Sequence, residues 1–192
     1  PEQLRSRFLG IHFFNPPRYM HLLELIPTAL TDPKVADQLE AFAASVVGKG
    51  VLRAYDTPNF IANRVGVASM MLTFREVERS GLGYDVVDDL TGKKMGRASS
   101  ATFRTADVVG LDTMNHVIKT LQSGARDDVF AAAFETPAAL TALLEKGNFG
   151  QKTKAGFFKK VGKDILQFNA ATGEYVAGGT KCDKDVADIL RK

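Results

Sequence analysis

The sequence predicts a mostly α fold, in which a short α/β part (residues 1–55) is followed by an all-α part (residues 56–192). Two patterns predict this division. Short apolar runs around one amphipathic stretch fill the first part, whereas apolar residues at helical spacing fill the second. With 192 residues, 45% of them hydrophobic, the chain is long enough to bury a core.

The α/β part contains three strand-like runs and one helix pattern. RFLGIHFF and HLLELIPT predict two strands, and GVLRAYDT predicts a third. Between them, residues 32–47 have helical spacing; Thr31 or Asp32 can cap this helix, Pro33 suits its first turn, and Gly48 ends it. Three strands and one helix bury too little surface to be stable alone, so we expect further strands to complete the sheet.

The second part predicts four helices, of which the longest lies within residues 58–81. The others start near Asp85, near Thr105 (continuing to Gly124) and near Pro137. The tail predicts a hairpin around residues 171–173 and a short helix over residues 185–190. The apolar stripe expected along the longest helix consists of Ile61, Val65, Ala68, Leu72 and Val77, with Met70, Met71 and Phe74 in the core or a helix interface.

Charge and cysteine content restrict the class of protein. The 25 basic and 22 acidic residues give a net charge of +3 without long runs of one sign, so nucleic acid is not the favoured partner. The single cysteine, Cys182, excludes an internal disulfide framework and favours a reducing, cytoplasmic location. No apolar stretch is long enough for a membrane span, and no metal site is predicted. The start at Pro1, without methionine, suggests a piece of a longer protein.

One imidazole and one carboxylate stand out among apolar residues. His12 lies in the run GIHFF, and Glu24 interrupts HLLELI. A buried carboxylate is costly unless it is paired, and Glu24 can accept a hydrogen bond from His12 if the two runs form neighbouring strands. The other ring nitrogen would then take or give a proton, as in a general base. The alternative is a half-buried structural histidine with Glu24 facing solvent.

A second motif, DTPNFIANR, marks the junction between the third predicted strand and the longest predicted helix. Asn63 lies in the first turns of that helix, where amides can bind a carbonyl or an oxyanion. In the alternative interpretation Asn63 only supports the junction and Arg64 forms a surface ion pair. His21 and His116 are interpreted as packing or surface residues.

Taken in order, HFFNP, the glutamate of LLEL and DTPNFIANR resemble the 3-hydroxyacyl-CoA dehydrogenase family, whose forms are HFFNP, L-V-E-V and DTPGFIxNR. The resemblance continues through VDDLTGKKMG, TADVVGLDT and QKTKAGFFKK and covers most of the chain. It implies that residues 1–55 are the incomplete end of a Rossmann-type dinucleotide-binding domain. Residues 56–192 would form a helical domain for substrate binding and dimerisation.

The resemblance also implies roles for four residues. His12 resembles the catalytic base, Glu24 the carboxylate that orients it, Asn63 the substrate-binding amide, and Asn15 the contact to the cofactor near the nicotinamide. The implied reaction is hydride transfer from C3 of an L-3-hydroxyacyl-CoA thioester to NAD in fatty-acid β-oxidation, giving a 3-ketoacyl thioester. A homodimer is the implied assembly.

Two departures from the family pattern are notable. Asn59 replaces the glycine usual after DTP. GRASSATFRTADVVGLD resembles the versions found in long multifunctional fatty-acid oxidation proteins, so an enoyl-CoA hydratase module is a candidate further part of the parent protein. Four lysines of the tail either meet a CoA phosphate or form a solvated face: Lys152, Lys154, Lys159 and Lys160.

The sequence contains no G-x-G-x-x-G turn for a dinucleotide pyrophosphate, and the family's catalytic serine would precede Pro1. We therefore expect this chain to be inactive without an amino-terminal cofactor domain. Two other functions stay open. The helical part could act mainly as an assembly module, or the protein could oxidise a small hydroxy acid instead of a CoA thioester.

Overall fold

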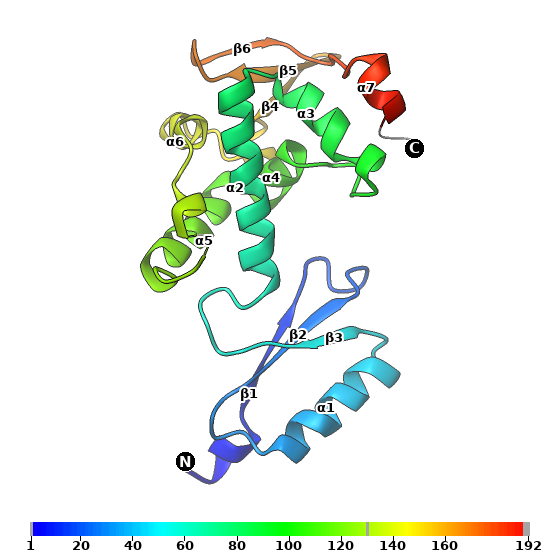
Figure 1. The fold of residues 1–192 in the computed structure, drawn as a ribbon, viewed down its shortest axis with the longest axis vertical. Coiled ribbons are helices and arrows are strands. Elements are labelled where there is room, and N and C mark those ends of the chain that lie inside the picture. The colour runs from blue at the N-terminus through cyan, green and yellow to red at the C-terminus, as the bar shows by residue number, and fades with distance from the viewer. Residues whose placement is uncertain (1, 130, 190–192) are drawn as a thin grey trace. The chain divides into compact units, whose positions relative to one another are not determined.

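A computed structural model describes residues 2–129 and 131–189 of the chain. Its internal contacts divide the chain into two compact units, Pro1–Val65 and Gly66–Lys192. The first unit contains strands and one long helix, and the second is rich in helices (Figure 1). The predicted order, an α/β part followed by helices, is therefore confirmed. None of the described helices is long and apolar enough to cross a bilayer.

The amino-terminal unit is a three-stranded sheet with one helix against it (Figure 1). Strand β2 is central, with β1 antiparallel on one side and β3 parallel on the other. Helix α1 covers the face on which Leu23 and Leu25 pack against Ala36 and Ala43. The elements are η1 Glu2–Arg7, β1 Leu9–Phe13, β2 Leu22–Pro27, α1 Pro33–Ser45 and β3 Gly50–Arg53.

Helix α1 begins as the sequence predicts, and Asp32 is the residue that caps it. Its side chain accepts a hydrogen bond from the Lys34 amide at 2.9 Å, and Pro33 occupies the first turn, where no amide hydrogen is needed. Thr31, the other candidate, donates its hydroxyl to the Phe8 carbonyl instead. The cap therefore fixes the residue at which the loop after β2 ends and α1 begins.

The carboxy-terminal unit contains helices α2 to α7 and a second three-stranded sheet beside α3 and α4 (Figure 1). The first residues of α2 belong to the amino-terminal unit. Its elements are α2 Ala62–Ser80, α3 Tyr84–Thr91, η2 Lys93–Met95, α4 Phe103–Val109, α5 Leu111–Gly124, η3 Ala131–Phe134, α6 Ala138–Glu145, η4 Gln151–Thr153, β4 Phe158–Val161, β5 Asp164–Asn169, β6 Glu174–Ala177 and α7 Lys184–Ile189.

The prediction of an all-α second part is wrong, because β4, β5 and β6 form an antiparallel sheet. The hairpin predicted around residues 171–173 joins β5 to β6, but β4 was not predicted as a strand. Its sequence, FKKV, carries two adjacent lysines and shows no apolar alternation, so only its hydrogen bonds with β5 reveal it. At the final helix α7, the predicted end at Leu190 lies outside the described residues.

The helix predicted from Thr105 to Gly124 is two helices, α4 and α5. Gly110 separates them with φ +96°, a conformation that residues with a side chain rarely adopt and that α-helices exclude. The apolar pattern continues across the break because both helices face the same core. Periodicity alone therefore could not reveal the interruption.

The stripe predicted for α2 is also partly wrong. Val65 is 64% exposed and Leu72 is 42% exposed, whereas Met71 and Phe74 are buried. Phe74 belongs to an aromatic cluster in which neighbouring ring centroids lie 4.5–5.3 Å apart. These large rings decide which face of α2 turns inward. The other members of the cluster are Tyr84, Phe103 and Phe157.

Asp107 joins α4 to the start of β4. The side chain is buried, and its two oxygens accept hydrogen bonds from the Phe157 and Phe158 amides at 2.8 and 2.9 Å. Burial raises the pKa of Asp107 from its ordinary value of 3.8 to about 6, because desolvation outweighs these two hydrogen bonds. The charged carboxylate is thus held in the core at a cost in stability.

We expect this cost to appear as a pH dependence of unfolding. A carboxyl with a raised pKa in the folded state favours folding most below pH 3.8, and this contribution is lost as the pH rises through about 6. The wild-type chain should lose about 3 kcal/mol more stability than Asp107→Asn between pH 3.5 and pH 7. Urea unfolding followed by circular dichroism measures the difference, and parallel pH profiles for the two chains would show that Asp107 is not responsible.

Candidate active site

His12 and Glu24 face each other across neighbouring strands. They are directly paired residues in the antiparallel register of β1 and β2, and His12 Nδ1 lies 2.7 Å from Glu24 Oε2. The Glu24 side chain is fully buried, whereas that of His12 is 28% exposed. The interpretation in which Glu24 faces solvent is therefore wrong. The structure forms the pair that the sequence suggested.

The second oxygen of Glu24 binds the start of helix α2. Oε1 accepts hydrogen bonds from the Ile61 amide at 3.0 Å and the Ala62 amide at 2.7 Å. Ile61, immediately before the helix, has no side chain that could cap these amides, so the remote carboxylate replaces a local cap. The amides and the helix dipole stabilise its negative charge. Glu24 thus orients His12 and holds the first turn of α2 at the same time.

Two aromatic rings enclose the imidazole. The centroid of the His12 ring lies 4.5 Å from that of Phe14 and 5.6 Å from that of Phe60. Within the described residues, no hydrogen bond to Nε2 of His12 is found. With Nδ1 held by Glu24, Nε2 is the atom at which a proton can be exchanged with a ligand. Sequence reasoning did not identify either ring as part of this site.

Asn59 and Phe60 place the second ring through an unusual backbone. Both have positive φ, +60° at Asn59 and +53° at Phe60, in the left-handed region. Asparagine tolerates this region better than most residues, which explains how Asn59 can stand where the motif usually has glycine. Asn59 therefore adopts a left-handed backbone conformation of the kind that glycine adopts readily.

We expect Asn59→Gly to destabilise the chain less than Asn59→Ala does, because glycine adopts the left-handed backbone without a steric penalty, although it has the greater entropy in the unfolded chain. Asn59→Ala should destabilise it by roughly 1–2 kcal/mol, since alanine has the steric penalty without any polar compensation. Chemical denaturation of the three chains tests this. Equal stabilities for the alanine and glycine variants would contradict it.

The two asparagines predicted as site residues lie on different elements. Asn63 is half-buried in the first turn of α2, directly after Ala62, whose amide binds Glu24. Asn15 is exposed in the segment that follows β1. In the part of the chain that the structure describes, no hydrogen bond joins either asparagine to His12 or Glu24. Both are attached to the elements that carry the pair, but they do not touch it.

A partly exposed imidazole, oriented by a buried carboxylate at the junction of a sheet and a helix, has the geometry that general acid–base chemistry requires. The comparisons with known proteins identify the family of the chain. Residues 2–57 match the NAD-binding domain of 3-hydroxyacyl-CoA dehydrogenases, and residues 60–160 match their carboxy-terminal domain. The chain belongs to the 3-hydroxyacyl-CoA dehydrogenase family.

Individual relatives agree with this assignment. The chain is 45% identical to a probable 3-hydroxyacyl-CoA dehydrogenase of Bacillus subtilis, over 91% of the chain and 22% of that protein. It is 46% identical to a protein of the same description from Deinococcus radiodurans, over 83% of the chain and 45% of that protein. The crystal structure of FadB2 from M. tuberculosis matches with a TM-score of 0.69 and 30% identity, over 81% of the chain and 53% of FadB2.

NAD is the cofactor of this family, whose NAD-binding domain residues 2–57 match. Asn15 is exposed two residues beyond β1, the strand that carries His12. The 192 residues contain no glycine-rich turn for the pyrophosphate. The chain spans about a quarter to a half of the length of the relatives that it matches.

Proposed function

We propose that this chain supplies the proton-transferring part of an NAD-dependent L-3-hydroxyacyl-CoA dehydrogenase that acts in fatty-acid β-oxidation. The observation that carries the proposal is the 2.7 Å contact between His12 Nδ1 and the fully buried Glu24. This contact fixes the ring and leaves Nε2 as the atom that meets the substrate. The match of both family domains supports the choice of substrate class.

In the proposed reaction Nε2 of His12 removes the proton of the substrate's 3-hydroxyl group as the carbonyl forms. NAD, when bound, accepts the hydride that leaves C3. The imidazolium that results is stabilised by Glu24, whose charge is in turn stabilised by the Ile61 and Ala62 amides. Asn63 would bind the thioester carbonyl, and Asn15 would contact the nicotinamide.

The lack of a pyrophosphate-binding turn in these residues predicts whether the chain is active by itself or only when joined to a further segment. Because G-x-G-x-x-G is absent from these residues, we propose that the chain by itself binds NAD weakly and does not turn over. Turnover should appear when an NAD-binding segment of the family is joined before Pro1. We call this fusion the assembled dehydrogenase.

The test is to follow NADH absorbance with the chain and with the assembled dehydrogenase, using acetoacetyl-CoA in one direction and L-3-hydroxybutyryl-CoA in the other. Free 3-hydroxybutyrate serves as the control for a small hydroxy acid. Activity restricted to the CoA thioesters supports the proposal. Turnover of the free acid at a comparable kcat/KM would favour the small hydroxy-acid alternative. Turnover by the isolated chain would contradict the proposal that an added NAD-binding segment is needed.

Assembly is a second candidate function, because α2 exposes two apolar side chains, Val65 and Leu72. A homodimer through this surface would cover them. Met71 is not a suitable test position, since it is buried in the core. Leu72→Glu should shift the chain to monomer in sedimentation velocity without loss of helical content, whereas an unchanged sedimentation coefficient would exclude this surface.

A hydratase module in the parent protein is also a proposal. Similar matched lengths, 174 and 159 residues, make up 22% of the B. subtilis relative and 45% of the D. radiodurans relative, so the family members differ about twofold in length. Together with the GRASSATFRTADVVGLD segment, this supports a long, multifunctional parent. Enoyl-CoA hydratase activity in the full parent protein would test it.

A further inference from the structure

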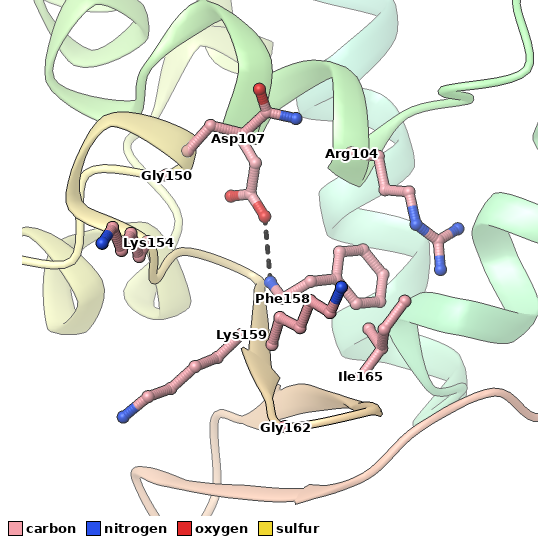
Figure 2. Close-up of a pocket in the computed structure, with 10 residues that line it drawn as sticks. Arg104, Asp107, Gly150, Lys154, Phe158, Lys159, Gly162 and Ile165 are labelled. Atoms are coloured by element: carbon pink, nitrogen blue, oxygen red, sulfur yellow. Dashed lines mark hydrogen bonds between the residues drawn. The ribbon is translucent and has the colours of Figure 1, made fainter.

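Four cationic side chains surround one cavity of the carboxy-terminal unit (Figure 2). The cavity has a volume of about 630 Å³ and lies between α4, the turn η4 and the hairpin of β4 and β5. Its size is in the range of small-molecule sites. The cations that line it are Arg104, Lys154, Lys159 and Lys160.

The charge of this cavity is not balanced by its own carboxylates. Asp107 is the acidic residue that lines it, and both of its oxygens already accept backbone amides. Across the residues that the structure describes, no ion pair with a carboxylate is found for Lys154, Lys159 or Lys160. Some other lysines of the same unit do form ion pairs, as Lys94 does with Asp89.

Two of the cations are held in place by aromatic rings. The Arg104 guanidinium lies 4.4 Å from the centroid of the Phe158 ring and 3.7 Å from Asp88. Lys159 Nζ lies 5.3 Å from the centroid of the Tyr175 ring. Such contacts reduce the entropy lost when a cation binds an anion. Arg104 and Lys159 are therefore not equivalent to freely moving surface charges.

The cavity also has apolar surface. Figure 2 shows Phe158 and Ile165 between the cationic side chains, and Ile165 is 46% exposed. The left-handed backbone of Lys154, with φ +59°, brings the end of η4 to the opposite side. A ligand with both anionic groups and an uncharged portion would match this combination.

We propose that this cavity binds a small molecule that carries two phosphate groups. Phosphate monoesters carry a charge between about −1.5 and −2 at neutral pH. They would pair with Lys154, Lys159 and Lys160, for which no ion pair is found among the described residues, and with Arg104, whose guanidinium also lies near Asp88. Phe158 and Ile165 would contact the uncharged part of the ligand. The site lies wholly in the carboxy-terminal unit and does not depend on the His12–Glu24 chemistry.

The test is isothermal titration calorimetry of the 192-residue chain with pyrophosphate and with adenosine 3′,5′-bisphosphate, in a buffer free of phosphate. We expect saturable binding that weakens as salt is raised. The double variant Lys154→Ala/Lys160→Ala should weaken it at least about tenfold. Lys163→Ala, in the turn between β4 and β5 but outside the cavity lining, is the matched control and should leave the affinity unchanged.

Comparison of the two affinities shows whether the cavity recognises a nucleotide or the phosphate groups alone. Tighter binding of the nucleotide than of pyrophosphate indicates a nucleotide-type ligand that uses the apolar wall, and equal binding indicates recognition of the phosphates alone. Both results support the site. Absence of saturable binding would overturn the proposal. Equal weakening by the double variant and by the control would also overturn it, since general attraction to a positive surface explains equal weakening.

Discussion

Replacement of His12 by glutamine is expected to lower kcat of the assembled dehydrogenase by roughly 10²–10⁴-fold, the usual contribution of a positioned general base. Glutamine can hydrogen-bond to Glu24 but cannot take up the hydroxyl proton. Because the His12 side chain is 28% exposed and its ring lies beside Phe14 and Phe60, which stay in place, we expect a small effect on stability. Initial rates with L-3-hydroxybutyryl-CoA measure the first effect and thermal unfolding the second.

His116→Gln is the matched control for this prediction. His116 is exposed on helix α5, so the same chemical change there should leave kcat and KM unchanged. If His12→Gln retained turnover within about tenfold of the unsubstituted enzyme, His12 would not be the base, and the proposed mechanism would fail. Thermal unfolding is measured on the same samples as activity. If the role of His12 is chemical, the variant loses activity while it remains folded.

Replacement of Glu24 by alanine is expected to destabilise the chain by about 3–5 kcal/mol, the cost of removing one partner of a buried polar network. It leaves His12 Nδ1 and the Ile61 and Ala62 amides without their acceptor. It also leaves a cavity where a fully buried side chain stood. Urea unfolding of the chain measures the loss.

Glu40→Ala is the control for Glu24→Ala. Glu40 accepts a hydrogen bond from Arg53 on the surface of α1, in a pair whose side chains are both more than a third exposed. Such surface pairs contribute about 0–1 kcal/mol, so this variant should unfold close to the wild type. Equal destabilisation by the two alanine variants would contradict a special role for the buried carboxylate.

Glu24→Gln separates the two roles of Glu24. Its single oxygen can accept either from the start of α2 or from His12, whereas the carboxylate does both. We therefore expect a milder loss of stability than in Glu24→Ala but a fall in kcat of at least roughly 10²-fold, because the imidazole loses its orientation and the imidazolium its counter-charge. A variant with full activity would show that the carboxylate acts only as a helix cap.

The sequence alone determined the local features of this protein. The three strands of the amino-terminal unit, a helix cap at Thr31 or Asp32 and the candidate pairing of His12 with Glu24 followed from short apolar runs, capping chemistry and the cost of an unpaired carboxylate, and the structure decided between the alternatives. The family resemblance followed from three motifs in order. Each of these signals is carried by side chains that are close in sequence or by residue types that are unusual for their surroundings.

Tertiary structure alone decided the features that depend on backbone groups and on distant segments. The Ile61 and Ala62 amides that bind Glu24, the break at Gly110 and the pairing of β4 with β5 involve main-chain hydrogen bonds or dihedral angles that no side-chain pattern encodes. The cationic cavity joins α4 to β4, some fifty residues apart, through the two amides that Asp107 binds. Packing brings these groups together because buried polar atoms need partners, wherever in the chain those partners lie.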